Sequence, residues 1–306
     1  MRLLTYDFRG REECGVLIER GVLPLSKLLA DRTRLSVLDA ISPEVRAQIR
    51  DAIEDYRGDF LPLESLRLLP PIPKPRSLRD FYAFEDHVRS MRKRRGLEVP
   101  EEWYEFPAFY YSNHTSIYSP GEDIPFPGYT SMLDYEMELA IVITGKGRDL
   151  TKENARELIG GYMFMNDWSA RDIQQKEMKI GLGPAKAKDF AKSFGPFVVT
   201  PDEFGSKGLE GRPDIEVEAR VNGKTYSKGN TKEMHYTFAE MIAHASKAVT
   251  IETGDIMGSG TVGGGCIAEI GPEVAGWLRP GDTVELVGPK LGTLMNRVGQ
   301  RRSLSE

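Results

Sequence analysis

The stretch LDYEMELAIVI, from Leu133 to Ile143, combines a row of acids with a fully apolar run and decides how the chain folds. Read with the two-residue repeat of a β-strand, it places Asp134, Glu136 and Glu138 on one face, at the mouth of a buried strand. Two like charges about 6 Å apart repel by about 3 kcal/mol at an effective dielectric near 20. The row therefore needs either water, as on a solvated strand face, or a cation.

Composition limits the classes of function. The chain has 306 residues, 40% of them hydrophobic, with 41 Lys plus Arg against 46 Asp plus Glu and a net charge of −5. This balance argues against a nucleic-acid partner. No apolar run reaches the roughly 18 residues of a membrane span, and the N-terminus has no signal-peptide core, so we expect a cytoplasmic protein without membrane contact. Cys14 and Cys266 form no Cys-x-x-Cys pattern, so a metal would be held by oxygen or imidazole.

The chain divides at a proline-rich segment. Residues 1–69 alternate short apolar runs with turns and include a predicted helix at about 43–56, which indicates a small β-rich module. The segment PPIPKP at 70–75 removes four backbone donors in six positions and is typical of a linker. Residues 70–306 then form the predicted catalytic domain. In it, Asn222-Gly223 predicts a hairpin, and FAEMIAHASKAVTI at 238–251 predicts a helix.

Polar residues that could take part in binding or catalysis follow the linker. Asp80 is read as a helix cap or a ligand, and His87 as a structural or catalytic imidazole. The helix predicted after His87 carries a cationic patch that is either a solvated face or an attractor for an acidic substrate. The aromatic and Pro-rich segment 97–128 is interpreted as a lid or wall over a site. The patch consists of Arg89, Arg92, Lys93, Arg94 and Arg95.

A second group lies beyond the acidic strand. Asp167 ends an apolar run, where it is either a cap or a functional acid. Arg171 and Gln174 follow at spacings of four and seven, which places them on one face with Asp167 if the segment is helical. Lys192 stands just before a Gly-Pro turn and a new strand.

Together these motifs resemble the fumarylacetoacetate hydrolase family. The resemblance covers residues 65 to 300 in order, and the stretch N-D-W-S-A-R-D-I-Q at 166–174 is its most specific part. It implies an α+β, mostly β fold: a mixed β-roll or sandwich catalytic domain with a small N-terminal β-rich module. The other matching motifs are Asp80 with His87, D-x-E-x-E at 134–138, K-S-F-G at 192–195, S-G-T at 259–261 and G-D-T-V-E-L at 281–286.

The resemblance implies a divalent-cation site. The family's metal ligands match Asp80, Glu136, Glu138 and Asp167, and Asp134 is then a structural acid beside them. Four carboxylates suit a hard cation, Mg²⁺, Ca²⁺ or Mn²⁺, rather than zinc.

The resemblance also implies the catalytic groups. His87 matches the family's water-activating base, and Glu269 the acid that orients it, with Glu85 as the alternative. Arg171, Gln174 and Lys192 match residues that bind substrate oxygens and stabilise an oxyanion. Tyr110, with Tyr111 as its competitor, and Thr261 match substrate contacts, and an Arg of the run 92–95, given as Arg95, is expected to meet a distal carboxylate.

The implied activity is hydrolytic cleavage of a carbon–carbon bond in a β-diketone acid, such as fumarylacetoacetate, fumarylpyruvate or an acylpyruvate, in aromatic-compound catabolism. The alternative is decarboxylation, hydration or tautomerisation of an oxo acid at the same metal site. A catalytically silent scaffold is a third possibility. The resemblance further implies a homodimer.

Overall fold

A long mixed sheet runs through the molecule. The computed structural model describes residues 1–29 and 35–301. Among them, eleven strands form this sheet, whose middle strands β10 and β11 are buried along their whole length. Its order is β3 (Gly21–Pro24), β2 (Arg11–Ile18), β1 (Arg2–Phe8), β13 (Lys192–Val199), β11 (Ile159–Asp167), β10 (Met137–Ile143), β16 (Asp255–Thr261), β5 (Ser77–Phe81) and β6 (Phe109–Tyr111), with β4 (Arg67–Leu69) on β1 and β7 (Ile117–Tyr118) on β13.

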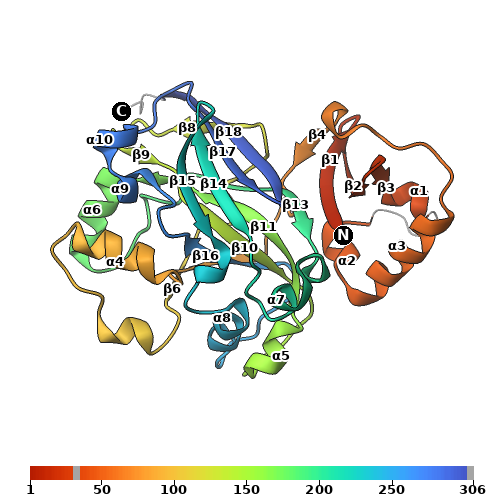
Figure 1. Cartoon of the computed structure of the whole chain (residues 1–306), viewed down its shortest axis with the longest axis horizontal. Helices are drawn as coiled ribbons and strands as arrows, with labels where there is room; N and C mark the ends of the chain where they lie inside the picture. The colour runs from red at the N-terminus through yellow and green to blue at the C-terminus, as the bar shows by residue number, and fades with distance from the viewer. Residues whose placement is uncertain (30–34, 302–306) are drawn as a thin grey trace.

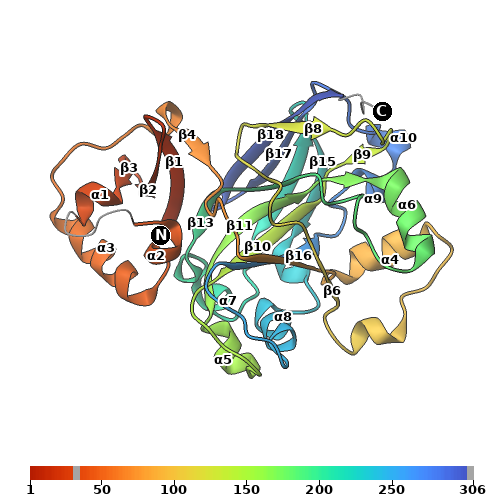
Figure 2. The same ribbon diagram turned by 180° about the vertical axis from the view of Figure 1, so that it is seen from behind.

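A second sheet packs beside the first, as Figures 1 and 2 show from opposite sides. Its hairpin turns at Asn222 and Gly223, whose φ angles of 51° and 77° are those of the tight turn predicted from the sequence, so that prediction is confirmed. The order of this sheet is β15 (Lys224–Asn230), β14 (Glu216–Val221), β17 (Thr283–Gly288), β18 (Gly292–Arg301) and β8 (Asp123–Phe126).

The long sheet is covered on both faces, which explains the apolar run after Glu138. In β10, Leu139 and Ile141 belong to the core that the two sheets share, whereas Ala140 and Val142 belong to a second core. That second core also contains Leu3 and other side chains of the N-terminal module. A strand buried on both faces reads as a continuous apolar segment.

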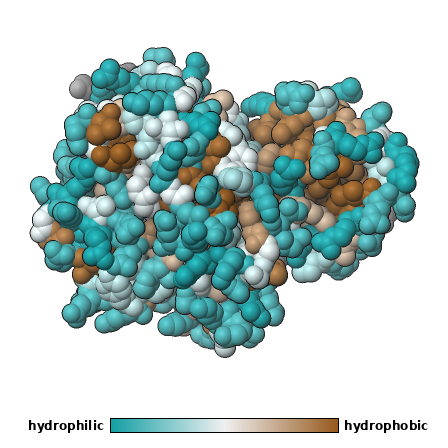
Figure 3. Space-filling view, viewed as in Figure 1, coloured by the Kyte–Doolittle hydropathy of each residue, from teal (hydrophilic) through white to brown (hydrophobic). Residues whose placement is uncertain are grey.

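The N-terminal module extends the same sheet. β1 pairs antiparallel with β13, with Arg2 opposite Val199, and the module forms the lobe at the right of Figure 1. Ile72, within the proline-rich segment, is buried in the second core. Figure 3 shows apolar surface gathered over this lobe, while most of the remaining visible face is hydrophilic.

Helices surround the sheets. α4, α6, α9 and α10 gather at one end of the larger part of the molecule, and α5, α7 and α8 lie at another (Figure 1). The helix predicted from about 43 begins at Pro43, with Ser42 as its cap. The helix predicted at 238–251 starts after a Thr237–Glu240 capping box but already ends at Ala245, and Ile251 forms a β-bridge with Gly147. The bounds are α1 Leu25–Leu28, α2 Val37–Ala40, α3 Pro43–Asp55, α4 Glu85–Lys93, α5 Lys152–Arg156, α6 Arg171–Ile180, α7 Gly205–Leu209, α8 Phe238–Ala245, α9 Ile267–Ile270 and α10 Pro272–Ala275.

Two local predictions need correction. The stretch from Leu133 to Ile143 is not one strand: β9 (Leu133–Asp134) pairs with β12 (Ser169–Ala170), and β10 starts only at Met137. The break lets Asp134 and Glu136 leave the sheet face and meet cations from other segments. Likewise, α6 begins at Arg171, so Asp167 ends strand β11 and does not share a helical face with Arg171 and Gln174.

None of the helices within residues 1–29 and 35–301 is long and apolar enough to cross a membrane.

Candidate active site

Three carboxylates converge at one end of the long sheet. Alternation along the strands puts Asp80 of β5, Glu138 of β10 and Asp167 of β11 on the face whose neighbouring positions fill the second core. Gly258 of β16 pairs with Asp80, and a Cβ there would lie 2.6 Å from Asp80 Oδ1. A residue without a side chain at 258 therefore leaves the space that the Asp80 carboxylate occupies.

These three acids fit a hard divalent cation. One ligand oxygen from each lies within 4.8 Å of the others, and all three side chains are buried. Asp80 Oδ1 and Glu138 Oε2 have no hydrogen-bond donor among the described residues. Burial, and then the neighbouring acids, raise the pKa of Asp80 and that of Glu138 well above the ordinary range. Buried anionic oxygens without donors are the ligands that Mg²⁺, Mn²⁺ or Ca²⁺ requires.

Glu136, the fourth predicted ligand, is held differently. Its Oε2 is 2.5 Å from Lys188 Nζ, and its Oε1 is 2.8 Å from the Arg171 guanidinium. Burial alone would raise the pKa of Glu136, but Lys188 and Arg171 outweigh it and bring that pKa below its usual value. The structure thus brings three of the four predicted carboxylates together and places the fourth in a pair of ion pairs beside them.

Lys188 is a site residue that the sequence did not reveal. Its Nζ donates to Asp167 Oδ2 at 2.8 Å and to Ser169 Oγ at 2.9 Å, besides its contact with Glu136, and the residue lines the cavity described below. Burial by itself would lower the pKa of Lys188, but the negative charges of Asp167 and Glu136 outweigh burial and raise that pKa above its usual value. The side chain therefore carries a positive charge. In the run PAKAKDFAK at 184–192, nothing local distinguishes this lysine from its neighbours.

Lys192, the lysine predicted for the oxyanion, lies deeper. It is fully buried, its Nζ is 2.6 Å from Asp167 Oδ1, and it contacts the Lys188 carbonyl. It is not among the described residues that line the cavity, whereas Lys188 is. Among these two lysines, Lys188 therefore borders the cavity, and Lys192 pairs with Asp167 away from it.

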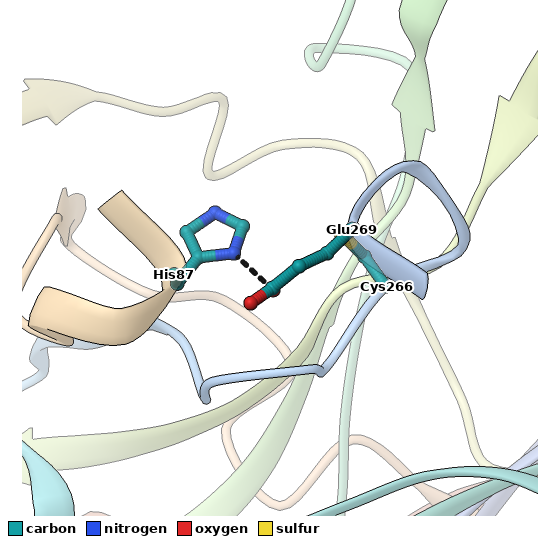
Figure 4. Close-up of side chains that lie close together, drawn as sticks. All are labelled: His87, Cys266 and Glu269. Carbon is teal, nitrogen blue, oxygen red and sulfur yellow. Dashed lines mark hydrogen bonds and ion pairs between the residues drawn. The ribbon is translucent and has the colours of Figure 1, made fainter. Parts of the chain in front are cut away.

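His87 and Glu269 form a buried pair. Figure 4 shows His87 from α4 facing Glu269 from α9, and Nδ1 of the imidazole is 2.7 Å from Glu269 Oε2. Glu85, the alternative partner, bonds instead to Arg89 and to the Tyr104 hydroxyl. A hydrogen bond donated by Nδ1–H to the Glu269 carboxylate leaves Nε2 as the acceptor of the ring. His87 also lines the cavity.

Cys266 lies next to this pair, as Figure 4 shows. Burial raises the pKa of its thiol well above the usual value, so the sulfur is a protonated neighbour and not a thiolate.

Arg171 connects several acids. Its Nε donates to Asp134 Oδ2 at 2.8 Å, and its Nη1 donates to Gln174 Oε1 at 2.9 Å as well as meeting Glu136. Its Nη2 is buried and has no acceptor among the described residues, although Arg171 lines the cavity. This donor is suited to an anionic oxygen of a ligand.

One cavity of about 930 Å³ joins these groups. Tyr110 lines it and donates to Asp167 Oδ2 at 2.7 Å, whereas Tyr111 is 65% exposed and lies beside Arg79. Thr261 Oγ1 lies 3.4 Å from Glu138 Oε1. The remaining lining is largely apolar, with a cationic edge. It includes Met91, Arg92, Arg94, Arg95, Leu97, Phe109, Met132, Gln174, Met178 and Trp277.

The edge arginines differ in their partners. Arg94 donates to the Glu269 carbonyl at 2.9 Å, and Arg92 contacts the Glu98 carbonyl. The Arg95 backbone N–H donates to the Arg92 carbonyl at 2.9 Å, but its guanidinium makes no hydrogen bond or ion pair with any described residue and lines the cavity. Segment 97–128 supplies Leu97 and Phe109, so the predicted wall does border the site.

Comparison with known proteins places this chain in a family. The model of the fumarylacetoacetate hydrolase C-terminal domain matches residues 77–299. A 2,4-didehydro-3-deoxy-L-rhamnonate hydrolase from Sphingomonas sp. (strain SKA58) is 31% identical over 310 residues, covering 100% of this chain and 99% of the relative. An oxaloacetate tautomerase, YisK, from Bacillus subtilis (strain 168) is 31% identical over 249 residues, covering 80% of this chain and 77% of the relative.

Solved structures share the fold. A fumarylacetoacetate hydrolase from the psychrophile Exiguobacterium antarcticum superimposes with a TM-score of 0.73 at 27% identity, covering 98% of this chain and all of the other. The relatives include both hydrolases and a tautomerase, so the family contains more than one reaction. The chain belongs to the fumarylacetoacetate hydrolase family.

Proposed function

We propose that this protein is a divalent-metal-dependent hydrolase that cleaves a carbon–carbon bond in a β-diketone acid. The observation that carries the proposal is the position of two different functional groups on one cavity. Asp80 and Glu138 offer oxygens without donors to a cation, and His87, held by Glu269, offers a free ring nitrogen. A hydrolase needs both an electrophile and a base that activates water.

Different groups of the protein would have different roles in this reaction. The bound cation, held by Asp80, Glu138 and Asp167, would supply Lewis-acid polarisation of substrate oxygens. His87 Nε2 accepts a proton from the attacking water, and Glu269 stabilises the resulting imidazolium through Nδ1. Lys188 and Arg171, the two buried cations that line the cavity, would stabilise negative charge on substrate oxygens.

The cavity supports an acidic substrate larger than a four-carbon oxo acid. Its volume of about 930 Å³ and its mostly apolar lining leave room for an acyl chain beyond the chelating oxygens. The side chains of Arg95 and Lys179 both line the cavity, and neither has a hydrogen-bond or ion-pair partner among the described residues. Arg95 is our candidate for binding a distal carboxylate.

Tautomerisation or decarboxylation of an oxo acid is the second candidate. One observation favours it: a tautomerase is among the 31%-identical relatives. A histidine base such as His87 can move a proton to and from carbon as well as from water. The reactions differ in what the base must do. Hydrolysis requires His87 to make the nucleophile, whereas decarboxylation depends chiefly on the cation as electron sink.

Parallel assays separate the candidates. Wild-type protein, His87→Ala and the control His114→Ala, an exposed histidine that lines no part of the cavity, are given acetylpyruvate, fumarylpyruvate and oxaloacetate with Mg²⁺ or Mn²⁺. We expect hydrolysis of a diketo acid by wild type, loss of it by about 10²-fold or more in His87→Ala, and no loss in His114→Ala. If wild type hydrolyses no diketo acid but tautomerises or decarboxylates oxaloacetate rapidly, the hydrolase assignment is wrong.

We also infer that the protein assembles as a homodimer. The resemblance to the family, whose members pair through the large β domain, supports this inference. Light scattering at micromolar concentration is expected to give twice the chain mass, and a monomer would contradict the inference.

A further inference from the structure

We propose that Asp134 is a positioning residue that holds two parts of the site at once. The anion-binding half contains Arg171, and the base half contains His87 and Glu269. This inference rests on the proposed function, because it assigns the two halves to one reaction. Asp134 is fully buried and lies in β9, opposite Ser169 of the antiparallel strand β12. It touches neither the cavity nor the cation ligands, so its action must pass through its partners.

The first arm runs to Arg171. Asp134 Oδ2 accepts from Arg171 Nε at 2.8 Å, and the same guanidinium meets Glu136 Oε1 at 2.8 Å. A guanidinium is planar, so fixing Nε sets the direction of both terminal nitrogens. Asp134 thereby aims the unpaired Nη2 of Arg171, the donor that lacks an acceptor within the described chain.

The second arm runs to the base. Asp134 Oδ1 accepts from the Ile267 backbone N–H at 2.8 Å, and Oδ2 accepts from the Ala268 N–H at 2.9 Å. These are the first two amides of α9, which otherwise have no intrahelical acceptor. Glu269 follows directly and holds His87 Nδ1. One carboxylate therefore fixes the start of the turn that carries the imidazole's partner.

A single rigid acid with partners in both halves has a kinetic consequence. Loosening the Arg171 arm weakens binding of an anionic substrate, which raises KM. Loosening the α9 arm misplaces Glu269 and His87, which lowers kcat because a small displacement of a base costs much of its effect. An acid that served only the fold would instead lower stability without separating these two quantities.

Asp134→Asn tests the proposal, with Asp255→Asn as the matched control. Asp255 is also a buried acid, bonded to the Ser77 hydroxyl and the Glu252 N–H and near Arg79, but it lies at the far end of β5 from Asp80. On acetylpyruvate with Mg²⁺, we expect Asp134→Asn to lower kcat about 10²-fold and raise KM about tenfold. Asp255→Asn should lower the melting temperature and change neither constant more than about twofold.

Double mutants assign the two effects. In a Glu269→Gln background, Asp134→Asn should lower kcat by less than about threefold, because the carboxylate that the α9 contacts position is already absent. In an Arg171→Lys background its effect on KM should likewise shrink. If the losses multiply in full in both backgrounds, Asp134 acts only through the fold and the proposal is overturned.

Ile267→Pro tests the α9 arm alone if Asp134→Asn does not fold. Proline is tolerated at the first position of a helix, and the preceding Cys266 already has the extended backbone that proline requires (φ −149°, ψ 161°). The variant removes one donor to Asp134 and leaves Arg171 untouched. We expect lower kcat with unchanged KM, and a raised KM at unchanged kcat would contradict the assignment of the arms.

A spectroscopic measurement makes the outcome independent of activity. The proton that His87 Nδ1 shares with Glu269 should give a low-field NMR signal, assigned by its loss in His87→Asn. Asp134→Asn should shift or broaden it, and Asp255→Asn should not. If the signal responds but no oxo acid is turned over, the proposed function fails and the positioning role stands. If turnover is found and the signal does not respond, the positioning role fails.

Discussion

The two ends of the acidic segment 134–138 have opposite electrostatic surroundings. We call the end with Asp134 and Glu136 the compensated end, because cations pair with these acids, and the end with Glu138 the uncompensated end. Asp134 and Glu136 are buried beside Arg171 and Lys188, which neutralise them. Glu138, two residues further on, is equally buried but faces Asp80, another acid, and its Oε2 has no donor among the described residues. The difference teaches that burial alone does not identify a metal ligand. Within this segment, Glu138 is the acid whose charge no protein cation balances; Asp167, the third acid of the proposed cation site, is paired with Lys188 and Lys192.

Glu138→Gln should have the largest effect on activity. It removes a ligand from the uncompensated end, and we expect turnover to fall by about 10³-fold because the charge that stabilises the reacting oxygens is lost. Its metal-free form should melt at a higher temperature than metal-free wild type, since a buried like-charge contact with Asp80 is removed. Activity assays and thermal melts in chelator measure both, and a metal-free variant less stable than wild type would contradict the comparison.

Lys188→Met probes the compensated end. The substitution leaves Glu136 without one of its two cations and Asp167 without one of its lysines. Breaking a buried ion pair from one side typically costs about 3–5 kcal/mol, so the free energy of unfolding should fall by about that amount. Urea denaturation measures it. The control Lys186→Met removes an exposed lysine paired with Asp189 and should change stability by less than about 1 kcal/mol.

Metal removal should act only at the uncompensated end. A cation bound at a concentration 100 times its dissociation constant stabilises the folded state by about 2.7 kcal/mol, and EDTA should abolish this gain. Melting curves with Mg²⁺, with Mn²⁺ and with chelator test the expectation. Glu138→Gln should lose most of the metal-dependent shift. Equal melting temperatures and equal activity with and without chelator would argue against a metal site.

Glu85→Gln should have the smallest effect. Glu85 lies one helical turn before Arg89 on the surface of α4, and such exposed pairs contribute about 0.3–0.5 kcal/mol. Activity should stay within about twofold of wild type. Glu269→Gln, which changes the carboxylate bonded to His87, should lower kcat by about 10²-fold. Steady-state kinetics of the two variants compares them, and a larger loss in Glu85→Gln would reverse the assignment.

Local patterns predicted local structure well. The hairpin at Asn222-Gly223, the helix beginning at Pro43 and the buried strand after Glu138 all form, because each depends on backbone preferences or on alternation within a few residues. The same patterns failed where a segment breaks. They did not show that the strand stops between Asp134 and Met137, because the irregular backbone there depends on β12 and α6, more than thirty residues away in the chain.

The sequence by itself determined the family, the hard-ligand character of the acids and His87 as the candidate base, since these follow from residue types and motif order. Only the tertiary structure decided which groups meet. Glu269 contacts His87 although 182 residues separate them in the chain. Lys188, and not Lys192, borders the cavity. Glu136 forms ion pairs with Arg171 and Lys188, so it is not an unpaired acid. The physical reason is that a charge's role depends on its neighbours in space, and pairing across the sheet sets those neighbours without leaving a local signal in the chain.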